Sequence, residues 1–365
     1  MIDHPADPLT PVKTLRRRAP DSRRAARRFA GLACACLLLI GWGASVAPGR
    51  AATREATHKN GDGYAWYCRG NAEDVHPVPT PGLLLCGGSD DIDDAFRWFV
   101  ARANGGDVVV LRASGDDEYD EYLDGLGPVV DSVETIVVTA PQGARDPFVV
   151  ERVRNAEAVF IAAGNQWSYV SDWKGTPLAE AIQARADAGV PIGGTSAGLA
   201  VLGQHVFSAA HGTIDSRAAL ADPRDERITI ESHFLRLPLM ADVIADTHFA
   251  AQDRMGRMMA FLGRVLESGA HQARGIGVDE KTGVLVESNG QARVVGLGAA
   301  YFLQARPMPG NVCEVGRLDL HDVEVERVPN GGRFDLARWK GPSPPYRLDV
   351  EKGALRSSRA DRGVY

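Results

Sequence analysis

The sequence is poor in the residues and motifs that hold metal ions. Its 365 residues include five cysteines and nine histidines, which form neither a His-Glu-x-x-His motif nor paired Cys-x-x-Cys motifs. The acidic run at residues 116–121 lacks the glycine and the spacing of a calcium-binding loop. We therefore expect no metal site, and no motif here calls for a cofactor.

An excess of basic residues is also missing. The chain has 41 Lys and Arg against 47 Asp and Glu, a net charge of −6. Because nucleic-acid binding needs clustered cations, no nucleic-acid partner is expected. No repeat of solenoid length is present. The hydrophobic fraction of 44% is that of a globular protein of one large or two ordinary domains.

The basic residues that are present crowd the N-terminus. Residues 29–47 are apolar and uncharged, and seven arginines precede them: Arg16, Arg17, Arg18, Arg23, Arg24, Arg27 and Arg28. With small residues around 49–51, this order predicts an export signal peptide over 1–51. A transmembrane anchor is the alternative, although the Gly, Ala and Ser content favours cleavage. We expect a periplasmic or extracellular protein without a stable membrane anchor after cleavage.

Three cysteines follow the predicted signal peptide, namely Cys68, Cys86 and Cys313. Export would place them in a compartment that permits disulfides. A bridge from Cys68 to Cys86 would close a short proline-rich loop, and we predict that pair. The alternative for Cys86 is a buried apolar role in a strand.

Short apolar runs alternate with amphipathic ones after residue 81. A helix is predicted over 91–103, and the strands over 82–86, 107–111, 133–138, 158–162 and at Ile192. Val-, Ile- and Leu-rich strands separated by helices predict a doubly wound α/β fold, with a mostly parallel sheet and helices on both faces. We expect a polar linker over 52–81, a catalytic domain over 82–305, and a C-terminal extension over 306–365 outside the main sheet.

A candidate nucleophile lies at Ser196. It sits in Gly193-Gly194-Thr195-Ser196-Ala197-Gly198, between a short apolar run and a predicted helix. A serine at the tip of such a turn projects its hydroxyl, and the flanking glycines remove Cβ atoms that would collide. The alternative is a glycine-rich turn that packs a strand against a helix.

A base and an acid are needed beside this serine. His248 follows the strand-like run 239–245, which places it at a strand end, and His233 is the rival. His205 lies nine residues after Ser196. Along the predicted helix this is a rise of about 13 Å, too far for a hydrogen bond between the two side chains. Asp215 falls between Ser196 and His248 and is our candidate acid. Other acids stay open: Asp222, Asp225, Glu226 and Asp246.

Four ordered blocks resemble the cyanophycinases and their relatives, the aspartyl dipeptidases. Between about residues 82 and 304 these blocks are Gly164-Asn165-Gln166, residues 193–198, residues 246–257 and residues 275–280. The resemblance implies a serine exopeptidase with a flavodoxin-like core, similar in architecture to class I glutamine amidotransferases. It implies Ser196 as nucleophile and His248 as base.

The resemblance also implies the surrounding site. The backbone N–H groups of Gly164 and Ala197 form the oxyanion hole in this reading. The residues that line the substrate site are Gln166, Asp246, Arg254 and Arg257. Two arginines at positions i and i+3 share a helix face, so both can meet an aspartyl carboxylate of the substrate.

The expected partner is a peptide or cyanophycin-like substrate, and the family suggests a homodimer. Cyanophycin is a polyaspartate backbone with arginine on its side carboxylates, and cyanophycinases release β-aspartyl-arginine; the acidic loops could receive the arginine. Three positions depart from the cyanophycinase pattern: Asn165, Thr247 and Gln252. The alternatives are a dipeptidase for acidic or isoaspartyl peptides and a binding protein without turnover.

Overall fold

The computed structural model describes residues 56–71 and 74–365, all within one compact unit, Thr53–Tyr365. The predicted signal peptide lies outside the described residues. Among the helices of these described ranges, none has the length and apolarity needed to cross a bilayer.

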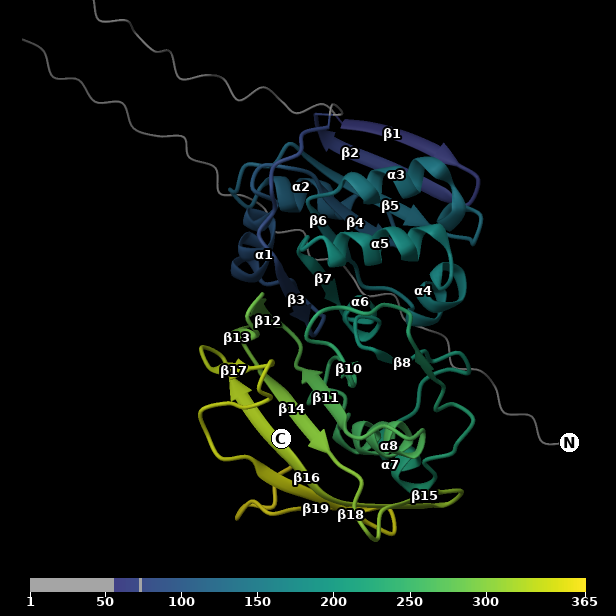
Figure 1. Cartoon of the computed structure of the whole chain (residues 1–365), viewed down its shortest axis with the longest axis vertical. Helices are drawn as coiled ribbons and strands as arrows, with labels where there is room; N and C mark the ends of the chain where they lie inside the picture. Colours follow the sequence, from purple (N-terminus) through teal and green to yellow (C-terminus); the bar gives the residue numbers. More distant parts are fainter. Residues whose placement is uncertain (1–55, 72–73) are drawn as a thin grey trace, which may run out of the picture. The chain divides into compact units, whose positions relative to one another are not determined.

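The first of two large sheets contains ten strands in the described part of the chain (Figure 1). Their order is β1 (Ala56–Gly61), β2 (Tyr64–Gly70), β5 (Ser132–Val138), β4 (Val108–Arg112), β6 (Ala158–Ile161), β7 (Ile192–Thr195), β3 (Gly82–Cys86), β12 (Thr282–Glu287), β13 (Gln291–Gly296) and β17 (Arg333–Asp335). The five strands from β5 to β3 are parallel, and the remaining pairs are antiparallel.

Helices cover both faces of this parallel core. Val108 and Val110 of β4 pack with α1 (Asp93–Val100) and α2 (Glu118–Asp124) in one apolar cluster. Val109 and Leu111 point to the other face, toward the helices α3 (Pro147–Asn155), α4 (Gln166–Trp173) and α5 (Pro177–Asp187). Since alternate residues of one strand enter different cores, every residue must be apolar. The predicted doubly wound α/β class is confirmed.

The second sheet carries the rest of the chain. Its order is β19 (Ala354–Ser357), β18 (Tyr346–Glu351), β16 (Arg317–Pro329), β14 (Ala299–Ala305), β11 (Ala273–Val278), β10 (Val243–Asp246), β8 (His205–Phe207) and β9 (Ile230–Ser232), with β15 (Val312–Glu314) paired to β16. The strands β8, β10 and β11 are parallel to one another. The helices α7 (Ser216–Ala221) and α8 (Met255–Glu267) pack on each other beside this sheet.

Two segments contribute more structure than the sequence predicted. The expected polar linker over 52–81 contains β1 and β2, and β2 pairs with β5 at the edge of the first sheet. Tyr64, Trp66 and Cys68 of β2 are buried at alternate positions, with polar or small residues between them. The C-terminal extension is not outside the sheets either, because β17 joins the first and β16, β18 and β19 join the second.

The predicted Cys68–Cys86 disulfide is wrong, since both thiols are free. Cys68 lies in β2 and Cys86 in β3, with four strands between them in the sheet. Five strand spacings correspond to about 24 Å. A disulfide requires Cα atoms within about 7 Å. Cys86 is buried, and burial raises the pKa of its thiol, as the alternative reading expected of an apolar strand residue.

Candidate active site

Ser196 occupies a strained turn between β7 and α6 (Ala197–Ala200). Its backbone has φ 52° and ψ −119°, a conformation that costs a non-glycine residue about 1–3 kcal/mol. A Cβ atom on Gly194 would lie 2.6 Å from the carbonyl carbon of Gly198, and one on Gly198 would overlap the carbonyl oxygen of Ile161. Both glycines are therefore dictated by close backbone approach, and the turn lifts the serine side chain above the strand.

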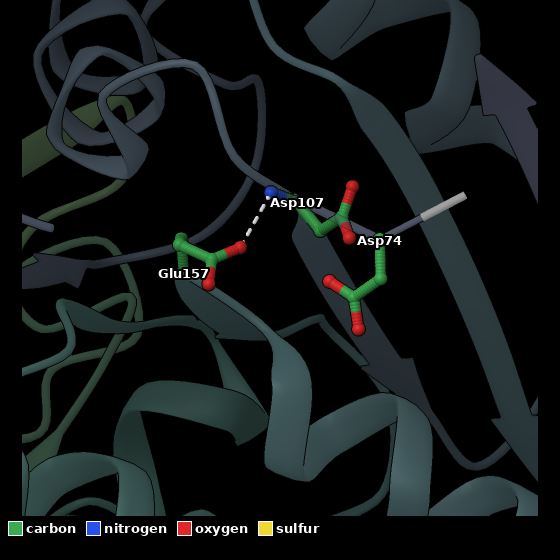
Figure 2. Close-up of side chains that lie close together, drawn as sticks. All are labelled: Asp74, Asp107 and Glu157. Atoms are coloured by element: carbon green, nitrogen blue, oxygen red, sulfur yellow. Dashed lines mark hydrogen bonds between the residues drawn. The ribbon is translucent and has the colours of Figure 1, made fainter. Parts of the chain in front are cut away.

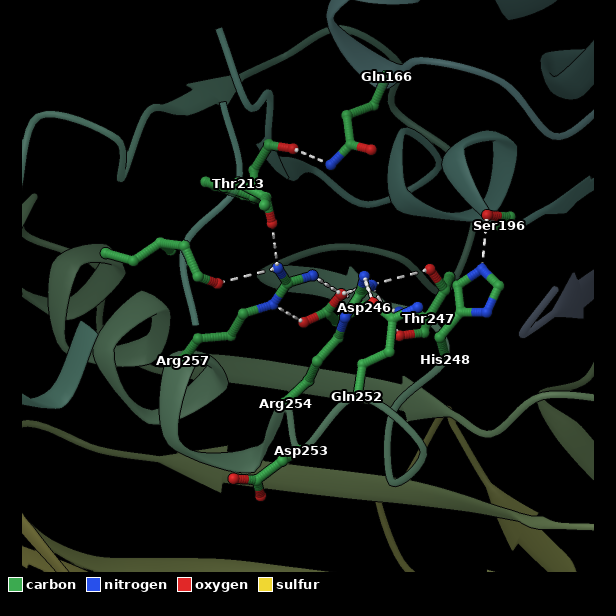
Figure 3. Close-up of polar contacts among 12 residues, drawn as sticks. Gln166, Ser196, Thr213, Asp246, Thr247, His248, Gln252, Asp253, Arg254 and Arg257 are labelled. Atoms are coloured by element: carbon green, nitrogen blue, oxygen red, sulfur yellow. Dashed lines mark hydrogen bonds and ion pairs between the residues drawn. The ribbon is translucent and has the colours of Figure 1, made fainter. Parts of the chain in front are cut away.

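A chain of hydrogen bonds runs from this serine to a carboxylate. Ser196 Oγ lies 2.9 Å from His248 Nε2 (Figure 3). On the other side of the ring, His248 Nδ1 lies 2.8 Å from Glu280 Oε1. His248 follows β10 by two residues and Glu280 follows β11 by two residues. These strands are parallel neighbours, so their carboxyl ends present the two side chains side by side.

The end of β3 fixes this arrangement through its main chain. Three consecutive carbonyl groups each accept one backbone N–H: Cys86 O from Ser196 (3.1 Å), Gly87 O from His248 (2.9 Å) and Gly88 O from Lys281 (2.9 Å), the residue after Glu280. We call residues 86–88 the β3 end. It links the nucleophile, the base and the acid without the use of a side chain.

Gly88 lies directly against the reacting pair. Its φ is 93°, and a Cβ atom there would lie 2.6 Å from His248 Nε2 and 3.0 Å from Ser196 Cβ. Only glycine fits both the backbone conformation and the space. The helix α1 that follows has Ile92 as its N-cap residue, and no side chain caps it.

Two backbone N–H groups are candidates for an oxyanion hole. Ala197 is the first residue of α6, and Gly164 lies in the loop after β6. Neither N–H donates to an acceptor within the described ranges. The contact of Gly198 with the Ile161 carbonyl brings this loop against the turn. The hydroxyl of Tyr169 donates to two carbonyls of the loop at 2.9 and 3.2 Å, which holds it in place.

The structure assigns the predicted acid Asp215 a different task. Its carboxylate accepts the backbone N–H of Ala218 at 2.8 Å and caps α7, a position that favours aspartate. The acid beside His248 is Glu280, so the chain order is serine, histidine, acid. The rival base His233 follows the edge strand β9, two strands away from β10.

Asp246 forms a buried ion pair with both predicted arginines (Figure 3). Arg257 binds it through Nε at 2.7 Å and Nη2 at 2.6 Å, and Arg254 Nη1 lies 3.0 Å away. Burial alone raises the pKa of Asp246, but the Arg257 guanidinium, with the help of Arg254, outweighs burial and holds that pKa below its usual value.

The arginines therefore meet an aspartyl carboxylate of their own chain. Arg257 is 3% exposed, and its Nη1 donates to Thr213 and to a carbonyl, so its donors are largely committed. Arg254 also donates to the Thr247 carbonyl and to the side chain of Gln252. We expected both guanidinium groups to be free to bind a substrate carboxylate. In the structure both bind Asp246 instead.

Gln166 begins α4 beside the loop that carries Gly164. Its side-chain nitrogen donates a hydrogen bond to the Phe207 carbonyl at 3.1 Å (Figure 3). The side-chain oxygen takes no part in this hydrogen bond. The preceding Asn165 accepts the N–H of Trp167 and caps α4. The predicted substrate residue Gln166 is thus anchored at the edge of the site.

One group of carboxylates in the described chain could hold a metal ion, and it lies elsewhere. Asp74, Asp107 and Glu157 place oxygen atoms within 4.8 Å of one another (Figure 2). Asp107 and Glu157 precede β4 and β6, whereas Ser196 follows β7, so the cluster and the nucleophile lie at opposite edges of the parallel strands. Arg152 approaches Asp107 to 4.0 Å. The cluster takes no part in the chemistry at Ser196.

Sequence reasoning missed two parts of this site. Glu280 ends one of the blocks that carry the family resemblance, and its place after an apolar strand is the same signal that selected His248. The β3 end acts through main-chain carbonyls, and two of its three residues are glycines without a side chain. Recognising either as functional required the pairing of β10 with β11 and the contacts of Gly88.

The chain is similar to known proteins over most of its described length. The profile of peptidase family S51 matches residues 83–295. A cyanophycinase of Geminocystis herdmanii is 29% identical over 269 residues, 69% of this chain and 93% of that protein. A cyanophycinase of a Nostoc species is 26% identical over 271 residues, 70% and 85% of the two chains. The crystal structure of a peptidase from an acI-B1 Actinobacterium covers 71% of this chain and 98% of its own, with 17% identity and a TM-score of 0.49.

Proposed function

Because this chain belongs to peptidase family S51 and is a serine-type peptidase, we propose a specific activity for it. We propose that it is an exported exopeptidase that cleaves aspartyl-linked amides. Cyanophycin is the proposed substrate and β-aspartyl-arginine the product. The observation that carries the proposal is the hydrogen-bonded chain from Ser196 through His248 to Glu280. A protein that only binds peptides has no need of these three hydrogen-bonded side chains.

The proposed reaction uses these three side chains in turn. His248 Nε2 takes the proton of Ser196 Oγ as the oxygen attacks the amide carbon, while Glu280 stabilises the imidazolium through Nδ1–H. The N–H groups of Ala197 and Gly164 bind the oxyanion, and each such donor contributes about 3 kcal/mol to the transition state. His248 then protonates the leaving amine. Water, deprotonated by the same nitrogen, releases the acyl group and restores Ser196.

The two relatives named above support cyanophycin as the substrate. Both are cyanophycinases, and their similarity to this chain covers most of their length. Three positions favour a second candidate, a dipeptidase for acidic or isoaspartyl peptides. Asn165 caps α4, and the side chains of Gln252 and Thr247 both accept hydrogen bonds from Arg254. The contacts of Gln252 and Thr247 change the surroundings of Arg254, one of the two arginines that the resemblance implies beside the substrate.

A product analysis separates these candidates. Wild-type protein and Ser196→Ala are incubated with cyanophycin and with isoaspartyl dipeptides, and the products are identified by mass spectrometry. Release of β-aspartyl-arginine by the wild type alone supports the first proposal, and cleavage of dipeptides alone supports the second. If neither substrate is cleaved although ligand binding is retained, the enzymatic assignment of this site is contradicted.

Export rests on the sequence of residues 1–51. Arginines followed by an uncharged apolar stretch and small residues are the parts of a cleavable signal. Expression in a bacterial host followed by fractionation and N-terminal sequencing tests it. The expected result is a periplasmic or extracellular protein that begins near residue 52. Full-length protein in the cytoplasm contradicts export.

A further inference from the structure

Residues 358–365 follow β19 and lie outside the family profile, whose match ends at residue 295. We call them the tail. Three of its carbonyl groups accept side-chain hydrogen bonds, namely Gly363 O from Ser357 Oγ (2.8 Å), Val364 O from the Tyr346 hydroxyl (2.7 Å) and Tyr365 O from Arg359 Nη1 (2.7 Å). Since Tyr346 belongs to β18 and Ser357 to β19, these bonds fix the tail against the second sheet.

The ring of Tyr365 joins an aromatic cluster next to the base. It meets Phe249 edge-on with centroids 6.0 Å apart, and Tyr301 edge-on at 5.8 Å. Phe249 is the residue after His248 and is fully buried. Its ring also lies against β11, where a Cβ atom on Gly277 would come within 2.6 Å of it. Phe249 therefore packs against both β11 and the tail.

The hydroxyl of Tyr365 binds the end of the loop that carries the base. We call residues 248–254 the base loop. The hydroxyl accepts the backbone N–H of Met255, the first residue of α8, at 2.9 Å and donates to the Asp253 carboxylate at 2.9 Å. In Figure 3 this carboxylate points away from Arg254. Because the first N–H groups of a helix have no partner within it, and the N-cap residue Arg254 supplies no side-chain cap, Tyr365 caps α8 from the tail.

The base loop contains two residues in the left-handed region. His248 and Asp253 both have a φ of 47°, and such conformations persist only where the surrounding structure enforces them. Inside the loop, the N–H of Gln252 donates to the His248 carbonyl at 3.0 Å, and the N–H of Arg254 donates to the Phe249 carbonyl at 2.9 Å. These bonds tie both ends of the loop together, so a displacement at Asp253 is transmitted to His248.

We propose that Tyr365 is a positioning residue for His248, a role that rests on the proposed chemistry of Ser196 and His248. Its ring and its hydroxyl fix the base loop and thereby keep His248 Nε2 at 2.9 Å from Ser196 Oγ. The β3 end holds the N–H of His248 through the Gly87 carbonyl, and the tail holds the following residues. A segment outside the family profile thus supports the chemistry of residues inside it.

A fluorophosphonate measures the reactivity of Ser196 without a peptide substrate. The bond from Ser196 Oγ to phosphorus forms, fluoride leaves, and His248 accepts the serine proton. In the full-length protein the inactivation rate constant should fall about 10–100-fold in Tyr365→Ala, because a small misplacement of a catalytic group has effects of this size. The decrease should be smaller in Tyr365→Phe, which keeps the ring and loses the hydroxyl. Ser196→Ala, which should not react, shows that the probe labels this serine.

Tyr67→Ala is the matched control. Tyr67 is half-buried like Tyr365 and its ring also contacts another ring, that of His58, but it lies on β2 of the first sheet. Thermal unfolding gives Tm of each variant, and the inactivation rates are measured well below Tm. Loss of packing alone lowers Tm and leaves the reactivity of the folded protein unchanged, which is the result expected for Tyr67→Ala. Loss of positioning lowers the reactivity itself.

Hydrogen exchange followed by mass spectrometry gives a second measurement that needs no reaction. In Tyr365→Ala the amides of residues 248–255 should exchange at least about tenfold faster than in the wild type, since Met255 loses its acceptor and the base loop loses its support. The amides of β2 should exchange as in the wild type.

The outcomes separate this role from the proposed function. Wild-type reactivity of Tyr365→Ala, unchanged exchange in the base loop, or an equal loss of reactivity in Tyr67→Ala overturns the role of Tyr365. If Tyr365→Ala does not fold, Tyr365→Phe decides by the same criteria. If the wild type does not react with the fluorophosphonate, the catalytic assignment of Ser196 fails, and the exchange measurement alone decides whether Tyr365 fixes the base loop.

Discussion

Asp246 and Asp107 are buried to nearly the same degree, 3% and 1% exposed, yet their pKa values move in opposite directions. Asp246, two residues before the base His248, is held by Arg257 and Arg254, and its pKa lies below the usual value. Asp107, at the far edge of the parallel strands, has a pKa raised by burial to about 7. Burial is similar, so the difference comes from the number and distance of the cations.

The surroundings of the two carboxylates explain this difference. Asp246 receives three charge-assisted hydrogen bonds from guanidinium groups at 2.6–3.0 Å. Asp107 accepts one bond from the Ser132 hydroxyl, lies near Glu134 and Glu157, and has Arg152 only at 4.0 Å. The catalytic edge therefore contains a fully paired carboxylate, and the far edge contains one whose pKa is raised to about 7, so that it is only partly ionised near neutral pH. Four substitutions probe this contrast.

The largest effect is expected at Glu280, the third carboxylate and the one that faces the reaction. Glu280→Gln removes the charge that stabilises protonated His248, and we expect kcat to fall by roughly 10²–10⁴. Steady-state kinetics on the substrate that the product analysis selects, with thermal unfolding to check the fold, measure it. Activity within threefold of the wild type would falsify the assignment of Glu280 as the acid.

Asp246→Asn should be the most destabilising of the other changes. It leaves the buried Arg257 without its countercharge, which typically costs about 3–5 kcal/mol. Denaturant unfolding at pH 7 measures the loss. The double variant Asp246→Asn/Arg257→Gln is the control, because it removes both charges and should recover part of the stability. A double variant whose loss equals the sum of the two single losses contradicts the pairing.

Asp107→Asn should stabilise the protein, and more at pH 8 than at pH 5. The raised pKa means that folded Asp107 keeps a proton between about pH 4 and pH 7 that the unfolded chain releases. The free energy of unfolding therefore decreases as pH rises through this window, and asparagine removes that decrease. We expect Tm at pH 8 to rise by about 2–4 °C.

The control for this prediction is Asp94→Asn, whose side chain is 81% exposed. It should leave Tm nearly unchanged at both pH values. Asp246→Asn should show the opposite trend to Asp107→Asn, since a carboxylate with a lowered pKa stabilises at neutral pH and loses that contribution in acid. A pH-independent effect of Asp107→Asn contradicts the contrast.

The smallest effect is expected for Asp215→Ala. Loss of the α7 cap typically costs about 1 kcal/mol, while kcat and KM should stay as in the wild type. Calorimetry and kinetics on the same preparation measure both. A large loss of activity with unchanged stability would return Asp215 to the catalytic site.

Local patterns were enough to predict the parallel core. Residues 108–111 are buried on both faces, so their apolar run is continuous and visible. The strand β2 escaped notice because it lies second from the edge of the sheet, and its buried residues alternate with half-buried ones. The strands of the extension were missed for a related reason, as β16 mixes Leu and Val with Asp, Glu and His along one strand.

The parts of the candidate site that lie in one short sequence segment were predictable. The contacts between residues far apart in the sequence were not. The spacing of glycines around Ser196 reflects close backbone contacts, and His248 stands at a strand end. The acid could not be chosen by order along the chain, because Glu280 reaches His248 only through the pairing of β10 with β11. For the arginines the chemistry was right, but an intramolecular carboxylate, Asp246, takes the place foreseen for a substrate.

The β3 end has a consequence for how such an enzyme can change its specificity. The alignment of nucleophile, base and acid depends on three main-chain carbonyls of residues 86–88. Side chains in the surrounding loops can therefore be exchanged, and new substrates accommodated, without any retuning of the proton path. The same arrangement makes the triad move as one body, so that a displacement of this single strand terminus would inactivate all three members together.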